Sequence, residues 1–157
     1  MATETGHRVQ TDVQSAEWMA GFLGGIAGAL VMGALMIAMN EAVIAVAIPS
    51  LYTLAPPPNV PVGMGVHVFH GAVLGLGFAA LVEVLGFDSN GRVAGFGIVW
   101  GILTWLALAA VLMPLWLSVV GSPASPPFPN FAPPSLFWHV VYGLVLSVGY
   151  AVAADEP

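Results

Sequence analysis

The sequence predicts an all-α fold, a polytopic membrane four-helix bundle built from two parallel helical-hairpin repeats. Hydrophobic residues make up 59% of the 157 residues and charged residues only 6%, whereas about a quarter of the residues of a soluble domain are charged. Long tracts carry no charge, and a helix needs only about 20 apolar residues to cross a bilayer. The charge-free tracts are 18–40, 42–82 and 93–154.

The composition also narrows the chemistry. The chain has no cysteine, which excludes disulfides, thiolate metal sites, iron–sulfur clusters and covalently attached haem. Its net charge is −6, and Arg8 and Arg92 are its only permanently basic side chains, so it has no basic patch for nucleic acid. Motifs of the common hydrolases and kinases are absent. We therefore expect a non-enzymatic membrane protein that does not bind nucleic acid.

The first predicted element follows a polar segment. Residues 1–17 contain Glu4, Asp12 and Glu17 and are expected to form a cytoplasmic tail, while residues 18–157 form the transmembrane domain. The first helix is predicted over about 16–47. It should end before Pro49, because the residue that precedes a proline disfavours the helical conformation.

The other three helices are separated by two kinds of connection. Proline-rich stretches follow the first and third helices, and a short turn of Gly, Asp, Ser and Asn follows the second. The predicted bounds are 63–85, 93–117 and 135–153. Four spans place both termini and the turn on one side. Arg8 and Arg92 lie on that side, so the positive-inside rule predicts a multi-pass protein of the cell membrane with cytoplasmic termini.

The two halves of the sequence resemble each other. The stretch VHVFHGAVLGLGFAALVE, residues 66–83, aligns with WHVVYGLVLSVGYAVAAD, residues 138–155, at a constant offset of 72. Further pairs match at offsets of 71 and 73. They are Pro58-Asn59 with Pro129-Asn130, and Gly24 and Gly28 with Gly97 and Gly101. Each copy, about 18–85 and about 93–154, contains two spans, so the repeats run parallel and predict a pseudo-twofold bundle.

Small residues recur at every fourth position of the predicted helices. Such spacing places them on one helix face and lets helix backbones approach closely in lipid. The residues predicted to pack helices are Gly24, Gly28, Gly71, Gly75, Gly97, Gly101, Gly143 and Ser147. His67 shares its stripe with Gly71 and Gly75, so we expect the histidine to point into the bundle.

The polar residues inside the spans are the candidate site. His67 and its counterpart His139 each lie about four residues, or ~6 Å, from a predicted helix start, in the outer leaflet. They are candidate axial ligands for a non-covalent haem b. With His70 and Glu41 they are also candidate ligands of a transition metal. Asn40 and Tyr142 would support the ligands. The copies diverge here, since Tyr142 matches His70 and Pro114 lies near the position that matches Glu41.

Three functions remain open at this stage. In the first, the histidines are structural and the protein is an accessory or structural subunit in the lipid bilayer, assembled as a homo-oligomer or with other membrane subunits. The second is a haem or metal module that uses His67 and His139. The third is a small transporter or proton path that uses Glu41 and the histidines, because an ionisable group inside a span is a functional hypothesis by default.

A family resemblance accompanies these motifs. The chain has a glycine-rich first helix, a histidine-led G-x-x-x-G second helix, a third helix that ends LMPLW and a last helix that reads FWHVVYGLVLSVGY. This combination resembles a group of small four-helix integral membrane proteins of haloarchaea, from Gly21 to Val152. The resemblance implies the same membrane fold, and the group has no established activity to transfer.

Overall fold

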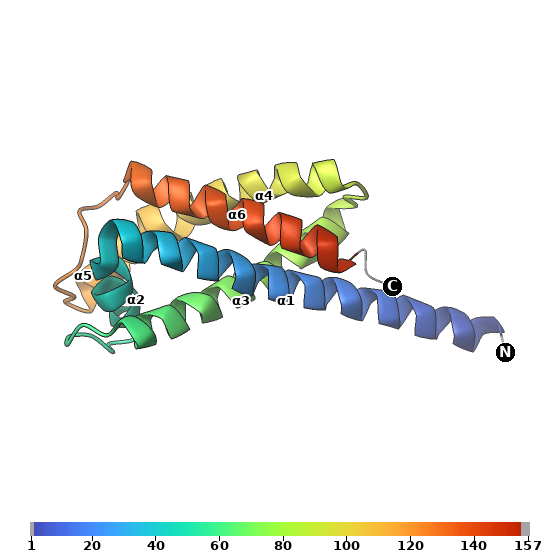
Figure 1. The fold of residues 1–157 in the computed structure, drawn as a ribbon, viewed down its shortest axis with the longest axis horizontal. Helices are drawn as coiled ribbons and strands as arrows, with labels where there is room; N and C mark the ends of the chain where they lie inside the picture. The colour runs from blue at the N-terminus through green and yellow to red at the C-terminus, as the bar shows by residue number, and fades with distance from the viewer. Residues whose placement is uncertain (1, 155–157) are drawn as a thin grey trace.

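The computed structural model describes residues 2–154 and the side chains of residues 15–154. This part of the chain is helical without strands, and four of its segments are long and apolar enough to cross a membrane. These segments are Ser15–Ser50, Val60–Leu85, Asn90–Val119 and Pro133–Ala154. The predicted all-α, four-span fold is therefore confirmed. Both proline-rich loops lie at one end of the bundle, which we call the proline-loop end (Figure 1).

Two of the spans change helix type along their length. The first consists of α1 (Ala2–Ala42), the π-helical η1 (Val43–Ala47) and α2 (Ile48–Ser50). The second is α3 (Val60–Leu85). The third consists of α4 (Asn90–Thr104), the π-helical η2 (Trp105–Leu112) and α5 (Met113–Val119), and the fourth is α6 (Pro133–Ala154).

The first span does not end before Pro49, contrary to the prediction. It bends at Asn40, whose φ of −160° and ψ of 79° are non-helical, and continues through Pro49 to Ser50. A proline lacks the N–H that would bond the carbonyl four residues earlier, and its ring crowds that carbonyl. The wider turns of η1 accommodate both effects, so the helix continues where an α-helix would stop.

A backbone hydrogen bond from the following loop satisfies the carbonyl that each proline leaves free. The Asn59 N–H donates to the Ala45 carbonyl at 2.8 Å, four residues before Pro49. The Asn130 N–H donates to the Ala110 carbonyl at 2.9 Å, four residues before Pro114. An unpaired carbonyl in lipid costs several kcal/mol. Pro114 therefore has the same role as Pro49. The sequence offset had instead placed Pro114 near the position that matches Glu41.

Local caps set the ends of α3. The Asn59 side chain accepts from the Val62 N–H at 3.0 Å, and the helix begins at Val60 with a proline in its first turn, three residues earlier than predicted. At the other end Gly86 adopts a left-handed φ of 64°, a conformation that a glycine takes without steric penalty. The short turn that follows leads directly into α4, so α3 and α4 run antiparallel.

Two different glycine faces of α1 hold two neighbours. The face of Gly21 and Gly25 lies against α3, where a Cβ added to Gly21 would come within 2.6 Å of Ala79 Cβ. The face of Gly24 and Gly28 lies against α6. A Cβ on Gly24 would lie 2.8 Å from the Leu146 carbonyl oxygen. Gly25 lies against Gly71 of its own hairpin, and Gly97 lies against Gly143 of its own hairpin. These contacts make Gly25 the counterpart of Gly97, at an offset of 72.

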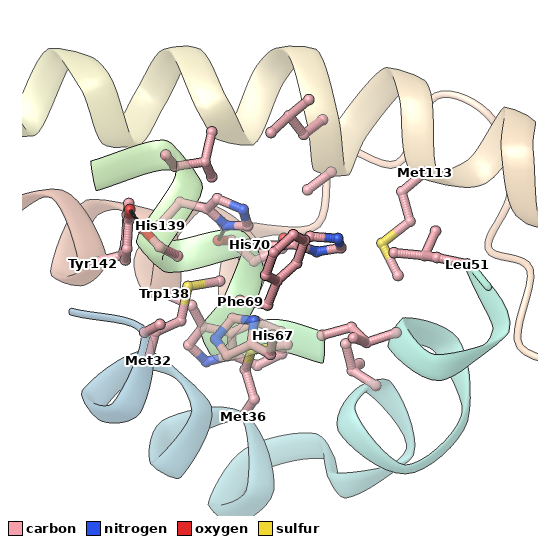
Figure 2. Close-up of a pocket in the computed structure, with 18 of the residues that line it drawn as sticks. Met32, Met36, Leu51, His67, Phe69, His70, Met113, Trp138, His139 and Tyr142 are labelled. Atoms are coloured by element: carbon pink, nitrogen blue, oxygen red, sulfur yellow. Dashed lines mark hydrogen bonds between the residues drawn. The ribbon is translucent and has the colours of Figure 1, made fainter. Parts of the chain in front are cut away.

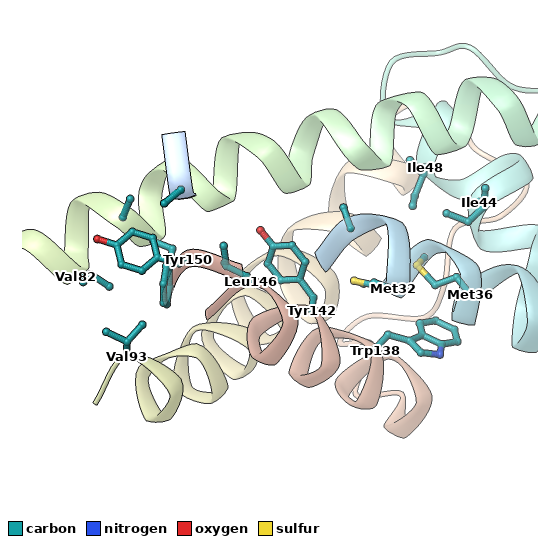
Figure 3. Packing of buried hydrophobic residues seen from close by; sticks show 14 residues of the cluster. Met32, Met36, Ile44, Ile48, Val82, Val93, Trp138, Tyr142, Leu146 and Tyr150 are labelled. Carbon is teal, nitrogen blue, oxygen red and sulfur yellow. The ribbon is translucent and has the colours of Figure 1, made fainter. Parts of the chain in front are cut away.

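The bundle is not a closed pseudo-twofold arrangement. α1 packs along α3 and α6, and α6 also packs along α4, but α3 and α4 have few contacts with each other. These contacts are aromatic, since Phe78 of α3 stacks on Phe96 of α4 with ring centroids 5.2 Å apart, and Trp100 lies 6.4 Å from Phe78. On α6, by contrast, Tyr142, Leu146 and Tyr150 form a buried row (Figure 3).

Candidate ligand-binding pocket

A pocket of about 640 Å³ lies in the proline-loop half of the bundle, beyond the aromatic contact between α3 and α4. Residues of α1, α3, α6 and the third span form its walls, and the segment that follows α2 contributes Leu51 and Tyr52. Figure 2 shows the histidines from α3 and α6 in this pocket. Its volume is within the range of about 300–1,000 Å³ that is typical of small-molecule sites.

Apolar side chains make most of the pocket wall. Methionines come from two spans, and aromatic rings come from α3, α5 and α6. These residues are Met32, Met36, Met113, Phe69, Trp116 and Trp138. Methionine and aromatic groups adapt to the shape of an apolar ligand and contact rings favourably. The wall therefore suits an apolar molecule that carries only a few polar atoms.

His67 contributes a buried polar atom that has no partner. Its side chain is 8% exposed, and its Nε2 atom has no hydrogen-bond partner in the structure. The close approach of α3 to α1 through Gly71 and Gly25 holds this residue inside the bundle. A buried nitrogen without a partner costs about 1–3 kcal/mol. A ligand that bonds Nε2 would recover this free energy.

His139 has a defined orientation and tautomer. Its Nδ1 lies 2.7 Å from the Ser135 carbonyl oxygen, one turn earlier on α6. Because a carbonyl oxygen can only accept, Nδ1 must carry the proton and donate. In the neutral imidazole Nε2 is then unprotonated and acts as an acceptor or as a metal ligand. The backbone of α6 thus fixes the chemical character of the atom that remains free.

His70 and Tyr142 already have partners. His70 Nε2 lies 2.7 Å from the Tyr52 hydroxyl, which connects α3 to the loop after α2. The Tyr142 hydroxyl donates to the Gly71 carbonyl at 2.8 Å, which connects α6 to α3. Both residues line the pocket, but their polar atoms stabilise its walls and are less available to a ligand than those of His67 and His139.

The structure brings together only part of the predicted site. His67, His70, His139 and Tyr142 line one pocket, whereas Asn40 and Glu41 are exposed at the bend near the end of α1 and lie outside it. Within residues 15–154, no group of three or more His, Asp and Glu side chains is placed to hold a metal ion. The predicted metal set of His67, His70, His139 and Glu41 is therefore not assembled.

Sequence reasoning missed several pocket residues. Tyr52 bonds His70 from the proline-rich loop after α2, and Ser135 orients His139 through its carbonyl. Trp116 Nε1 donates to the Leu51 carbonyl at 2.9 Å and so joins the two halves beside the pocket. The sequence did contain a signal for Trp116, because this residue follows Pro114 by two positions in the LMPLW motif. No sequence signal identifies a backbone carbonyl such as that of Ser135.

Comparisons with known proteins give a family and no function. Residues 15–157 match the model of a family of unknown function, DUF6789. No curated protein and no solved structure matches the chain.

Proposed function

The chain belongs to the DUF6789 family of unknown function, and we propose that it is a non-enzymatic, multi-pass membrane protein that binds an apolar small molecule in the pocket. In this role it is an accessory component of the bilayer. The observation that carries the proposal is the partnerless His67 Nε2 in a pocket whose wall is mostly apolar. A site that orients an apolar ligand with a few polar groups is the usual form of a small-molecule pocket.

The test is to identify what the purified protein carries. We expect an organic extract of the protein in mild detergent to contain one apolar compound at close to equimolar amount, measured by mass spectrometry. Ala109 is buried in η2 and lines the pocket, so Ala109→Trp should fill the space and exclude the compound. Ala107 is exposed on the same segment, so Ala107→Trp is the matched control and should retain the compound. Equal extracts from both variants would overturn the proposal.

Haem b is a second candidate for the occupant. The tautomer of His139 favours it, because a histidine that ligates a metal generally donates its other ring N–H to a carbonyl or carboxylate. His67 would supply the second axial nitrogen from α3. The expected result is a reducible haem absorption band that disappears in His67→Ala and in His139→Ala. A folded, colourless protein grown with ample haem would eliminate this candidate.

The proton-path hypothesis has less support. It requires Glu41 beside the histidines, whereas Glu41 is exposed outside their pocket. We therefore do not base the function on a conducted proton. Assembly with further copies of the chain or with other membrane subunits stays a prediction.

We also propose that both termini are cytoplasmic and that the two hairpins are copies of one ancestral hairpin. The matched backbone bonds of Asn59 and Asn130 support the duplication. Because the chain has no cysteine, single substitutions can test the orientation. A membrane-impermeant maleimide should label Ser122→Cys in intact cells and Ser89→Cys only after lysis. The reverse pattern would invert the proposed topology.

A further inference from the structure

We infer that the pocket binds the head group of a lipid-soluble quinol, whose apolar tail passes between α3 and α5 into the bilayer. This inference rests on the proposed function and names the ligand class. Four properties of the pocket lead to it: the charge of its surroundings, its two free ring nitrogens, its wall and its side opening.

The charge of the chain favours a neutral ligand. Arg8 and Arg92 are the only permanently cationic side chains of the sequence, and Arg92, the one whose side chain the structure describes, does not line the pocket. A carboxylate in such surroundings would be desolvated without a partner, at a cost of several kcal/mol. Fatty acids, and the propionate groups of a haem, would face this cost. A quinol carries no charge.

The two free ring nitrogens match a molecule with two oxygen atoms. The unprotonated Nε2 of neutral His139 can accept a hydrogen bond from a quinol hydroxyl. His67 Nε2 has no partner. The other ring nitrogen of His67 donates to the backbone of Ala29, so Nε2 of the neutral ring is also an acceptor and can bond the second hydroxyl. The two imidazoles come from different helices, α3 and α6, so one ring bonded to both would connect the two hairpins.

The wall suits a flat ring. Trp138 and Met36 are nearly fully buried there, at 4% and 3% exposed, and Met32 lies one turn from Met36 on α1. Offset aromatic contacts contribute about 0.5–1.5 kcal/mol beyond the burial of area, and a methionine sulfur packs well against a ring. The polar atoms of the wall that remain free are few, which suits a ring whose only polar atoms are its oxygens.

The pocket is open on the side that faces lipid. Among the described residues, α3 has no extensive contact with η2 or α5. Pocket residues that border this gap have large exposed fractions, with Phe69 at 60%, Val73 at 49% and Leu112 at 54%. An apolar tail can leave through the gap without crossing a polar surface. The opening therefore favours a ligand with an apolar tail over a compact ligand, which would not need it.

The experiment titrates purified protein in lipid nanodiscs with a decyl benzoquinol under anaerobic conditions and follows the quenching of tryptophan fluorescence, since Trp116 and Trp138 line the pocket. We expect saturable quenching, at least tenfold weaker in His67→Ala and in His139→Ala. His139→Gln retains an acceptor and should stay within about threefold of the native affinity, which separates a lost hydrogen bond from a misfolded protein. His7→Ala, in the polar tail, is the control and should not change the affinity.

The possible outcomes separate this inference from the proposed function. Equal quenching in the native protein and in both alanine variants would overturn the quinol assignment, because quenching would then reflect partition of the quinol into lipid. If the native protein yields a different apolar compound on extraction and does not bind the quinol, the assignment is wrong and the proposed function stands. If it yields no compound and binds no quinol, both are wrong.

Discussion

Two helix pairs at matching positions of the two halves pack in opposite ways. α1 and α6 are in close contact, because Gly24 and Gly28 bring the α1 backbone against Leu146 and Tyr142. The residues 72 positions later on α4 are Phe96 and Trp100, and their rings keep α4 away from the α3 backbone. The first pair forms an interface and the second leaves a gap. The proline-loop part of that gap is the pocket.

The difference shows how little sequence change is needed to make a site in a membrane bundle. Helices in lipid gain no hydrophobic free energy from association, so they associate through close packing and hydrogen bonds. Glycine lets two helices pack closely along their length. A large ring holds them apart and makes contact at only one height along the helix axes. On the proline-loop side of Trp100, the side chains of α3 and of the third span leave space between these helices.

The largest expected effect follows from giving α1 the residue that α4 has. In Gly28→Trp even the Cβ atom would lie 2.9 Å from the Tyr142 carbonyl oxygen, a contact that the backbone of α6 cannot relieve locally. Overpacking a core is destabilising, and because this clash involves backbone atoms we expect loss of the monodisperse folded protein. The control is Gly65→Trp, because a Cβ at Gly65 meets nothing within 4 Å. Size-exclusion chromatography in detergent measures both.

A smaller effect follows from removing the aromatic contact between α3 and α4. Phe78 is fully buried and touches both Phe96 and Tyr150. We expect Phe78→Ala to lower the free energy of unfolding by about 3–5 kcal/mol, as for other buried aromatic truncations. Unfolding in SDS gives the value. Phe137 is 50% exposed on α6, and an equal loss in Phe137→Ala would show that this contact has no special weight.

A third prediction concerns the feature that the two halves share. Asn130→Pro removes the N–H that bonds the Ala110 carbonyl and should lower the free energy of unfolding by about 1–3 kcal/mol, the cost of an unpaired buried polar group. Asn130→Ala keeps this N–H and should change it little. Titration with SDS distinguishes the two variants, and equal values would mean that the loop does not support η2.

The smallest effect is expected from the single side-chain hydrogen bond that joins α6 to α3. Tyr142→Phe removes the bond to the Gly71 carbonyl and should cost about 0.5–1.5 kcal/mol. The measurement is again unfolding in SDS. A loss as large as that of Phe78→Ala would mean that the contact between α6 and α3 depends on this hydroxyl more than on packing.

The sequence predicted the number and order of the spans because hydrophobic length alone determines them. It did not predict the continuation through Pro49, because η1 and the Asn59 N–H compensate for the proline in three dimensions. Gly24 and Gly25 lie on different faces of α1 but are adjacent in the sequence, so either one aligns with Gly97 to within one position. Only the contacts in the structure show which of them is the counterpart. The sequence also predicted Glu41 as a partner of the histidines. The bend at Asn40 moves Glu41 out of the site, and no periodicity in the sequence indicates that bend.

The hydrogen bond between Trp116 and the Leu51 carbonyl has a consequence for how the pocket fills. It joins the two hairpins beside the pocket at the proline-loop end, while the gap between α3 and α5 stays open to lipid. A ligand would then reach the pocket by diffusion within the membrane plane. Occupancy would follow the mole fraction of the ligand among the lipids and not its molarity in water. A sparingly soluble compound could saturate the site even when its aqueous concentration is negligible.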